Sequence, residues 1–222
     1  MNSDSKNLLL FGSIAALTVV TAYCLKRVSD LERNVKDKDP KKEYHKPRSI
    51  LLVRHGQSEG NIDERKYQTV GDVHIQLTEE GKQQASLAGE EIAAKVAGRK
   101  VFVYVSPYTR TRETAEIIKG QLQKAKIDVV LWREDPRIRE REFCGTFQKE
   151  NVPSDIQSGK SYSKFFFRPA SGESCADVYD RMSSFIDTLW RDFKYFEAME
   201  DNVVLIISHG LTSRLFLMRW LH

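Results

Sequence analysis

The sequence predicts an α/β domain of three layers, with helices on both faces of a mostly parallel central sheet, preceded by one membrane helix. Short apolar runs alternate along the chain with segments of helical period, which is typical of β-α-β units. The membrane helix is predicted because residues 8–25 carry no charged side chain. With 222 residues, 41% of them hydrophobic, the chain can build one sizeable core, and nothing after the N-terminal region indicates a second domain.

Leu8–Leu25 is the candidate membrane anchor. As a helix this segment would be about 27 Å long, just enough for a hydrocarbon core of about 30 Å. Residues 26–48 contain nine basic and five acidic residues, so the positive-inside bias predicts a single-pass protein whose folded domain is cytosolic. The outer mitochondrial membrane and the endoplasmic reticulum both suit such an anchor. A cleaved signal peptide is the alternative, although Lys6 is the only basic residue before the apolar run.

This reading divides the chain into a short tail (1–7), the anchor (8–25), a basic linker (26–48) and one folded domain (49–222). The whole chain has a formal charge of +4, all of which resides in the linker, where Tyr44 is the only aromatic residue. We therefore expect no nucleic-acid partner. Three cysteines, Cys24, Cys144 and Cys175, lack metal-ligand spacing and are odd in number, which fits a reducing compartment. We expect neither a metal nor a cofactor.

The first strand of the domain is Ile50–Val53, an apolar run that suits a strand buried on both faces. Arg54 and His55 follow at its carboxyl end, where parallel sheets place their chemistry, and Gly56 allows a close backbone approach. Near the other end of the chain, an apolar run over 203–207 breaks into Ser208-His209-Gly210. If the two strands are neighbours, two imidazoles and one guanidinium converge.

Between these strands the sequence predicts two helices and two strands. Thr78 is a suitable N-cap for a helix that ends near Gly98. Val101–Val105 is the next strand. Ser106 and the proline after it should be the N-cap and first residue of the following helix. The expected buried positions of that helix are Tyr108, Thr111, Ala115, Ile118 and Leu122.

Arg110 lies off this buried stripe, in the first turn, where a helix N-terminus favours anions. Another strand is expected over residues 128–132. Residues 149–171 then read as a surface excursion of the kind that often covers an active site. Ser174–Asp177 is a capping box that begins a long amphipathic helix, with buried positions expected at Val178, Met182, Phe185, Leu189 and Phe196.

The last predicted element is an apolar helix over Leu211–Leu221. The chain stops at His222 within that pattern, which leaves open a longer natural protein.

Three motifs together carry a family resemblance: Arg-His-Gly-x-Ser over residues 54–58, Ser-Pro-x-x-Arg over 106–110 and Ser-His-Gly over 208–210. The chain resembles the histidine phosphatase superfamily, in its phosphoglycerate-mutase-like branch, and looks most similar to plant and fungal members. The resemblance implies the fold of that branch and a phosphohistidine formed on His55. It also implies catalytic roles for His209 and a glutamate, and a phosphate site that includes Arg54, Ser58, Asn61, Arg110 and Gly210.

The family keeps its general acid as a glutamate a few residues before a glycine. Glu140 fits that pattern if Cys144 replaces the glycine, whereas Glu142 lies closer to Gly145 than the pattern requires. We favour Glu140 and keep Glu142 as the alternative. Each can also be a solvated charge paired with a neighbouring arginine.

Cys175 and Arg181 have the Cys-x5-Arg spacing of cysteine-dependent tyrosine phosphatases. The interval is predicted to be helical and lacks glycine, so it cannot supply the loop of free amides which those enzymes need. We therefore expect a membrane-anchored phosphatase that acts on a small phosphorylated substrate or a phosphoprotein. A mutase of the phosphoglycerate type and a catalytically idle adaptor of the same fold are the alternatives.

Overall fold

The computed structural model describes residues 46–143, 162–196 and 201–221. Several predictions fall outside the described residues: the anchor Leu8–Leu25, the linker up to residue 45, Cys144 with Gly145, and residues 149–161 of the surface excursion. Among the helices that the structure does describe, none is both long enough and apolar enough to span a membrane.

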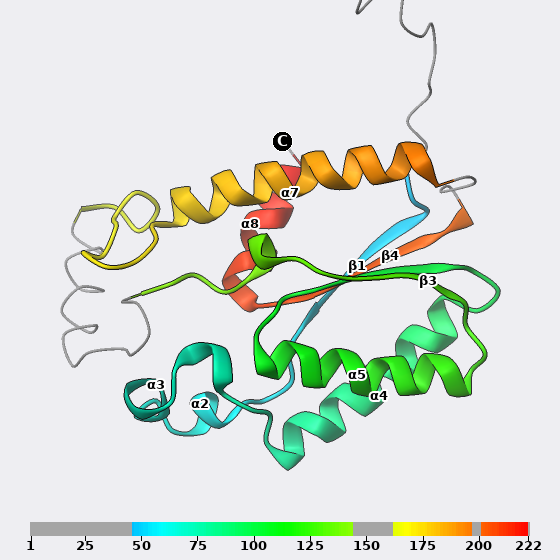
Figure 1. The fold of residues 1–222 in the computed structure, drawn as a ribbon, viewed down its shortest axis with the longest axis horizontal. Helices are drawn as coiled ribbons and strands as arrows, with labels where there is room; N and C mark the ends of the chain where they lie inside the picture. Colours follow the sequence, from blue (N-terminus) through cyan, green and yellow to red (C-terminus); the bar gives the residue numbers. More distant parts are fainter. Residues whose placement is uncertain (1–45, 144–161, 197–200, 222) are drawn as a thin grey trace, which may run out of the picture. The chain divides into compact units, whose positions relative to one another are not determined.

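The centre of the domain is a sheet of four strands, β1 (Ser49–Arg54), β2 (Val101–Val105), β3 (Val129–Glu134) and β4 (Val203–Ser208). Their order is β1-β4-β2-β3, and every pairing between them is parallel (Figure 1). The predicted neighbourhood of the two His-Gly strands is confirmed. β4 lies between β1 and β2, and is buried over its whole length.

One detail of the strand prediction is wrong. β1 was expected to be buried on both faces, but its residues are only partly buried and Arg54 is exposed. The reason is its position, since β1 forms an edge of the described sheet and pairs with β4 alone among the described strands. The apolar run therefore marks a strand correctly but does not distinguish an edge strand from a central one.

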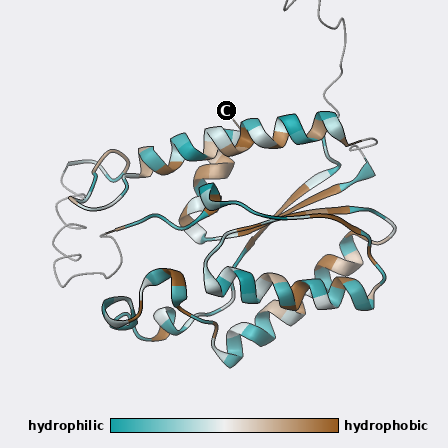
Figure 2. Cartoon of the chain, viewed as in Figure 1, coloured by the Kyte–Doolittle hydropathy of each residue, from teal (hydrophilic) through white to brown (hydrophobic). Residues whose placement is uncertain are grey.

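Helices cover both faces of the sheet, so the three-layer α/β/α prediction is confirmed (Figure 1). On one face α4 (Glu79–Lys95) and α5 (Thr109–Lys124) enclose a core of small and β-branched residues that includes Ala115, Ile118 and Val103. On the other face lie α7 (Cys175–Tyr195) and α8 (Gly210–Leu221). The strands are the most hydrophobic part of the domain, and the helices carry their hydrophilic residues outward (Figure 2).

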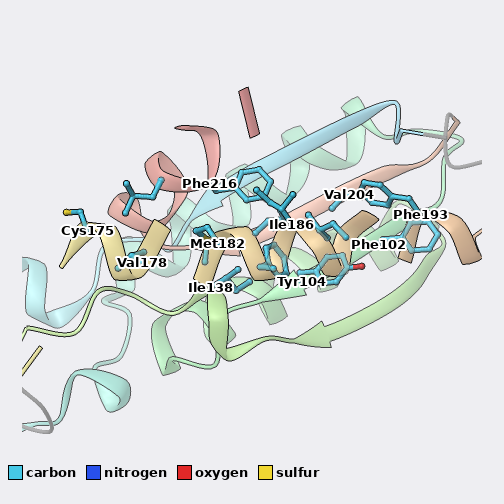
Figure 3. Close-up of a cluster of buried hydrophobic side chains, with 14 residues drawn as sticks. Phe102, Tyr104, Ile138, Cys175, Val178, Met182, Ile186, Phe193, Val204 and Phe216 are labelled. Carbon is cyan, nitrogen blue, oxygen red and sulfur yellow. The ribbon is translucent and has the colours of Figure 1, made fainter. Parts of the chain in front are cut away.

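The core beneath α7 is built from larger side chains. Figure 3 shows Met182, Ile186 and Phe193 of α7 pointing toward Tyr104 and Phe102 of the sheet. The helical spacing of the predicted positions Val178, Met182, Phe185 and Leu189 accounts for this, and all four are fully buried. The capping box predicted for this helix is also confirmed, because Ser174 accepts a hydrogen bond from the Asp177 amide and the Asp177 carboxylate accepts one from the Ser174 amide.

The start of α5 differs from the prediction. The helix begins at Thr109 with Tyr108 as its N-cap, and not at Ser106 and Pro107. Ser106 is held instead by the sheet: its amide donates to the Ile207 carbonyl at 2.9 Å. Tertiary bonds thus keep Ser106 out of the helix, although Thr78 caps α4 as predicted by accepting the Gly81 amide.

Short elements connect these larger ones near the carboxyl ends of the strands. After β1 come α2 (Glu59–Ile62), α3 (Lys66–Thr69) and the 3₁₀ turn η1 (Asp72–His74). A second 3₁₀ turn, η2 (Pro136–Ile138), follows β3 and packs against α7.

Candidate active site

The two His-Gly strands bring His55 and His209 together. β1 and β4 run in register, with Arg54 opposite Ser208, so both histidines emerge at the same edge of the sheet. The His55 amide donates to the Ser208 carbonyl at 3.1 Å. The two imidazole rings lie 5.3 Å apart between centroids at an interplanar angle of 62°.

The surroundings of His55 fix which ring nitrogen is free to react. Its Nδ1 lies 2.7 Å from the Gly56 carbonyl, an acceptor, so Nδ1 carries the proton and Nε2 carries the lone pair. The pKa of His55 is lowered to about 4, chiefly by burial and also by Arg110 and Arg54, while the hydrogen bond to the Gly56 carbonyl opposes this shift. The imidazole is therefore neutral at physiological pH, which a nitrogen nucleophile requires.

Gly56 also allows the loop after β1 to lie directly against the start of α4. A Cβ at Gly56 would lie 2.3 Å from the Gly81 carbonyl oxygen, and one at Gly81 would lie 2.0 Å from the Gln57 oxygen. The Gly56 amide donates to Thr114 of α5 at 3.1 Å. Close backbone contact therefore holds the loop that carries His55.

Arg110 lies at the centre of the site, and its side chain is only 2% exposed. Its Nε donates to His55 Nε2 at 3.3 Å, and its Nη1 donates to Asp72 through both the carbonyl (2.7 Å) and the carboxylate (2.8 Å). The guanidinium also lies 5.0 Å from the ring centroid of Tyr108. A permanent positive charge is thus held against the nucleophilic nitrogen.

His209 is fully buried. Its Nε2 lies 2.8 Å from the Ser106 hydroxyl, while its Nδ1 has no hydrogen-bond partner among the described residues. Burial, followed by the positive charge of Arg110, holds the pKa of His209 well below its usual range.

Arg54 and Gly210 meet beside the histidines. A Cβ at Gly210 would lie 3.7 Å from Cδ and Nε of Arg54, an ordinary van der Waals distance, so the arginine side chain lies beside this glycine. Arg54 is exposed and makes no ion pair within the described residues.

Ser58 and Asn61 interact with each other at the start of α2. Both the amide and the hydroxyl of Ser58 donate to Asn61 Oδ1, at 3.0 and 3.1 Å. Ser58 is fully buried whereas Asn61 is exposed. Their phosphate-binding role stays a prediction, and in this conformation the Ser58 hydroxyl already has an acceptor.

The surroundings of the two candidate acids differ. Glu140 Oε1 accepts from the Arg141 amide at 3.0 Å and from the Thr212 hydroxyl of α8 at 3.4 Å. Burial raises the pKa of Glu140, and the Asp72 carboxylate adds to this, while the Arg141 amide and Arg110 oppose it. Glu142 is tied to Glu173, with its amide donating to that carboxylate at 3.1 Å. The acid role remains untested, but Glu140 is the glutamate whose surroundings favour the protonated form.

Arg181 holds the segment that carries Glu140. From within α7 its guanidinium donates to the carbonyls of Arg137, Arg139 (3.0 Å) and Glu140 (3.1 Å), and to both carboxylate oxygens of Glu173 at 3.0 Å. These bonds join the turn after β3 to the residues just before α7. The arginine of the Cys-x5-Arg spacing therefore has a structural task.

Cys175 confirms that this spacing lacks the geometry of a cysteine phosphatase. The residue is buried in the first turn of α7, and its sulfur accepts from Arg141 Nη1 at 3.6 Å. The residues between Cys175 and Arg181 are helical, so their amides do not form a phosphate-binding loop.

Sequence reasoning missed four residues of the site. Asp72 lies between the predicted elements and received no prediction, yet it binds Arg110, and Thr212 was only part of a predicted helix, yet it reaches Glu140. Tyr67 of α3 packs on Gly60, and Ser106 was predicted as a helix cap but binds His209. Among residues 46–143, 162–196 and 201–221, no group of His, Cys, Asp and Glu residues is arranged to hold a metal ion.

Comparison with known proteins decides the family. The profile of the histidine phosphatase superfamily, branch 1, matches residues 50–222. The chain belongs to this superfamily. The chain is 43% identical over 185 residues to the phosphoglycerate mutase-like protein AT74 of Arabidopsis thaliana, an alignment that covers 78% of the chain. The same alignment covers 58% of AT74, so the chain spans less than two thirds of that relative.

Two further proteins that are similar to the chain are named as phosphatases. The broad-range acid phosphatase DET1 of Saccharomyces cerevisiae is 29% identical, with 79% of each chain covered. A mycobacterial glucosyl-3-phosphoglycerate phosphatase, Rv2419c, has a similar structure, with a TM-score of 0.57 over 76% of this chain and 78% of that one. At 22% identity this second likeness shows the fold alone.

Proposed function

We propose that this histidine phosphatase hydrolyses phosphomonoesters through a phosphohistidine on His55. The observation that carries the proposal is the state of the His55 ring, which is neutral, buried, and presents Nε2 to the guanidinium of Arg110. A deprotonated ring nitrogen beside a fixed positive charge is suited to in-line attack on a phosphoryl group once that group takes the place of the Arg110 hydrogen bond.

In the first step His55 Nε2 donates its lone pair to phosphorus. The bond from phosphorus to the ester oxygen breaks, its electron pair stays on that oxygen, and protonated Glu140 supplies the proton. The raised pKa of Glu140 supports this role. Arg54 and Arg110 stabilise the charge spread over the equatorial oxygens.

In the second step water attacks the phosphohistidine. The phosphorus–nitrogen bond breaks and returns the electron pair to His55 Nε2, while the Glu140 carboxylate takes the proton of the water. The products are the alcohol and inorganic phosphate, and the enzyme returns to its starting protonation. Neither step requires a metal, because the arginines supply the positive charge.

The distribution of charge favours a substrate with one phosphoryl group over the phosphoglycerate mutase alternative. A mutase that works through a bisphosphate intermediate must also hold a second phosphoryl group. Within the described residues, however, Arg112 pairs with Glu134, Arg137 with Asp135, and Arg139 and Arg181 with Glu173, while Arg141 donates to the backbone carbonyls of Glu173 and Phe167. Arg54 and Arg110 can serve one phosphoryl group.

The names of the relatives support a phosphatase that acts on small phosphorylated molecules. One relative is a broad-range acid phosphatase and another protein of the same fold is a phosphatase of a phosphorylated sugar acid. A phosphoprotein substrate remains within the proposal, and a screen with sugar phosphates, phosphoglycerates and phosphopeptides separates these classes. The catalytically idle adaptor is disfavoured because the residues that the reaction needs are present and close together.

The proposal includes attachment to a membrane through Leu8–Leu25, with the catalytic domain on the cytosolic side of the outer mitochondrial membrane or the endoplasmic reticulum. The apolar length of that segment and the basic residues after it support this location.

Trapping of the covalent intermediate tests the nucleophile. Brief exposure of the full chain to a ³²P-labelled phosphomonoester should give an adduct that is labile in acid and stable in alkali. His55→Ala should abolish the adduct, and Cys175→Ser should leave it intact. We assign His209 as a hydrogen-bond donor to the transferring phosphoryl group. His209→Ala should therefore slow formation of the adduct roughly 10²- to 10³-fold, the usual loss for one preorganised donor. An adduct that survives His55→Ala, or depends on Cys175, would contradict the proposal.

A further inference from the structure

Asp72 places a carboxylate on the arginine that would bind the phosphoryl group. Arg110 Nη1 donates to the carbonyl oxygen of Asp72 at 2.7 Å and to its Oδ1 at 2.8 Å, so one residue engages this nitrogen twice. The Asp72 side chain is 17% exposed and belongs to the short turn η1, between α3 and α4. None of the three sequence motifs includes this residue.

The two bonds to Asp72 determine where the rest of the guanidinium points. Nη1 lies on the side of Cδ, so the opposite edge of the planar group carries Nε and Nη2. Nε donates to His55 Nε2, and Nη2 makes no hydrogen bond within the described residues. The Nε–Nη2 edge, which can bind two phosphoryl oxygens, therefore faces His55. Asp72 binds the guanidinium of Arg110 on the opposite side, at Nη1.

The carboxylate also changes the electrostatics of the site. A negative charge 2.8 Å from Nη1 offsets much of the positive charge of Arg110 and repels an incoming dianion. Ground-state binding of phosphate is weakened, whereas the donors that face the transferring group keep their positions. Weak binding of the ground state is useful to an enzyme that must release inorganic phosphate after each cycle.

We propose that Asp72 is a positioning residue, which fixes the Nε–Nη2 edge of Arg110 toward His55 and prevents product phosphate from binding tightly. The proposal rests on the phosphohistidine mechanism proposed above. It separates two properties of one side chain: the hydrogen-bond acceptor that orients Arg110, and the charge that weakens phosphate binding.

Two variants separate these properties. Asp72→Asn keeps an oxygen acceptor and loses the charge, whereas Asp72→Ala loses both. The Asp72 carbonyl still accepts from Arg110 in either variant, which favours retention of the fold. Asp63→Asn is the matched control, because Asp63 lies on the same connection but pairs with exposed Arg65 at 2.8 Å.

Two measurements on the full chain in detergent are required. Calorimetric titration with inorganic phosphate, above its second pKa and at low salt, gives the Kd for the dianion. Rapid quench with a labelled phosphomonoester gives the rate of adduct formation. For Asp72→Asn we expect the Kd for phosphate to fall about threefold to tenfold, while the rate of adduct formation stays within about threefold of wild type. For Asp72→Ala we expect a similar fall in the Kd, but adduct formation should be at least about tenfold slower. Asp63→Asn should change neither.

An unchanged or raised Kd in Asp72→Asn would overturn the charge role, and a wild-type adduct rate in Asp72→Ala would overturn the positioning role. A purely structural residue would instead lower the fraction of active protein and leave the Kd of the remainder unchanged. If wild type forms no adduct on His55, the proposed function fails, but the phosphate titration still decides whether the Asp72 charge opposes anion binding.

Discussion

Two histidines occupy equivalent positions after two neighbouring strands, yet their partners differ. His55 donates Nδ1–H to a backbone carbonyl and turns Nε2 toward Arg110, whereas His209 uses Nε2 to bind the Ser106 hydroxyl. The repeated His-Gly pair does not by itself indicate which histidine attacks, and it was the family resemblance that implied His55. Hydrogen bonds to groups from other elements make that distinction, and they support His55.

The choice between Glu140 and Glu142 can be tested by the dependence on the leaving group. Glu140→Gln should slow turnover of an alkyl phosphate by roughly 10²-fold or more, because its poor leaving group needs a proton, and should affect an activated aryl phosphate much less. Glu142→Gln serves as the matched control. It should lower the turnover rates of both substrates slightly and by the same factor. Steady-state rates on the two substrates are sufficient. If only Glu142→Gln shows the dependence, the two roles are exchanged.

Motifs predicted the residues that lie next to the strand ends, and missed residues whose role depends on distant partners. Arg54, His55, Arg110 and His209 could be located because each follows or begins a recognisable element. Asp72 could not, because its bond to Arg110 joins residues 38 positions apart through a turn without a pattern of its own. A lone aspartate in a connecting segment is usually solvated, so the sequence offers no signal for this contact.

Among the elements, α7 links stability to the site. Its buried stripe packs on the sheet, while Arg181 on the same helix holds three carbonyls of the segment 137–140 and pairs with Glu173. The hydrophobic period predicted the packing, and the capping box predicted where the helix begins. The hydrogen bonds of Arg181 to these carbonyls, here called the Arg181 clamp, were not predicted, because donation to backbone carbonyls leaves no pattern in the sequence.

Arg181→Met should therefore reduce both stability and activity. It leaves the largely buried Glu173 carboxylate with fewer partners, so the free energy of unfolding should fall by about 3 kcal/mol. Turnover of the alkyl phosphate should fall more than that of the aryl phosphate, because Glu140 loses its support. Urea denaturation and the same pair of substrates provide the measurements.

The double variant Arg181→Met/Glu173→Gln is the control for the buried pair. It should be less destabilised than the sum of the two single variants, since neither partner is then left with an unpaired charge. Strictly additive losses in the free energy of unfolding would argue against the Arg181 clamp. So would an Arg181→Met variant that loses stability but slows the alkyl and aryl phosphates equally.

Other elements were predicted in kind but not in detail. The strands are in the expected places, yet β1 is an edge strand, and α5 begins two residues later than its apparent cap and proline suggest. Both differences arise because the sheet imposes bonds which local preferences do not include. Ser106 is a good helix cap in isolation, but in the domain it is bonded to β4 and His209.

At the scale of the whole molecule, the proposed anchor predicts where the protein is found. Full-length protein should remain in the membrane pellet after alkaline carbonate extraction, and a reporter fused after His222 should be digested by protease added from the cytosolic side. The matched control lacks residues 8–25 and should be recovered in the soluble fraction. Release of the full-length chain by carbonate would exclude the anchor while leaving the site untouched.

The central position of β4 has a consequence for how the enzyme becomes active during synthesis. Among the described strands, β1 pairs with β4 alone, and β4 also joins β1 to β2, although about 150 residues separate β1 from β4 in the sequence. A nascent chain that has exposed β1, β2 and β3 still lacks the strand that joins β1 to β2, and such non-local pairing is slow. His55 leaves the ribosome early, but the site cannot form until His209, which directly follows β4, has also been synthesised. Catalytic competence should therefore arise late and in a single step, after β4 has inserted between two strands that were made long before it.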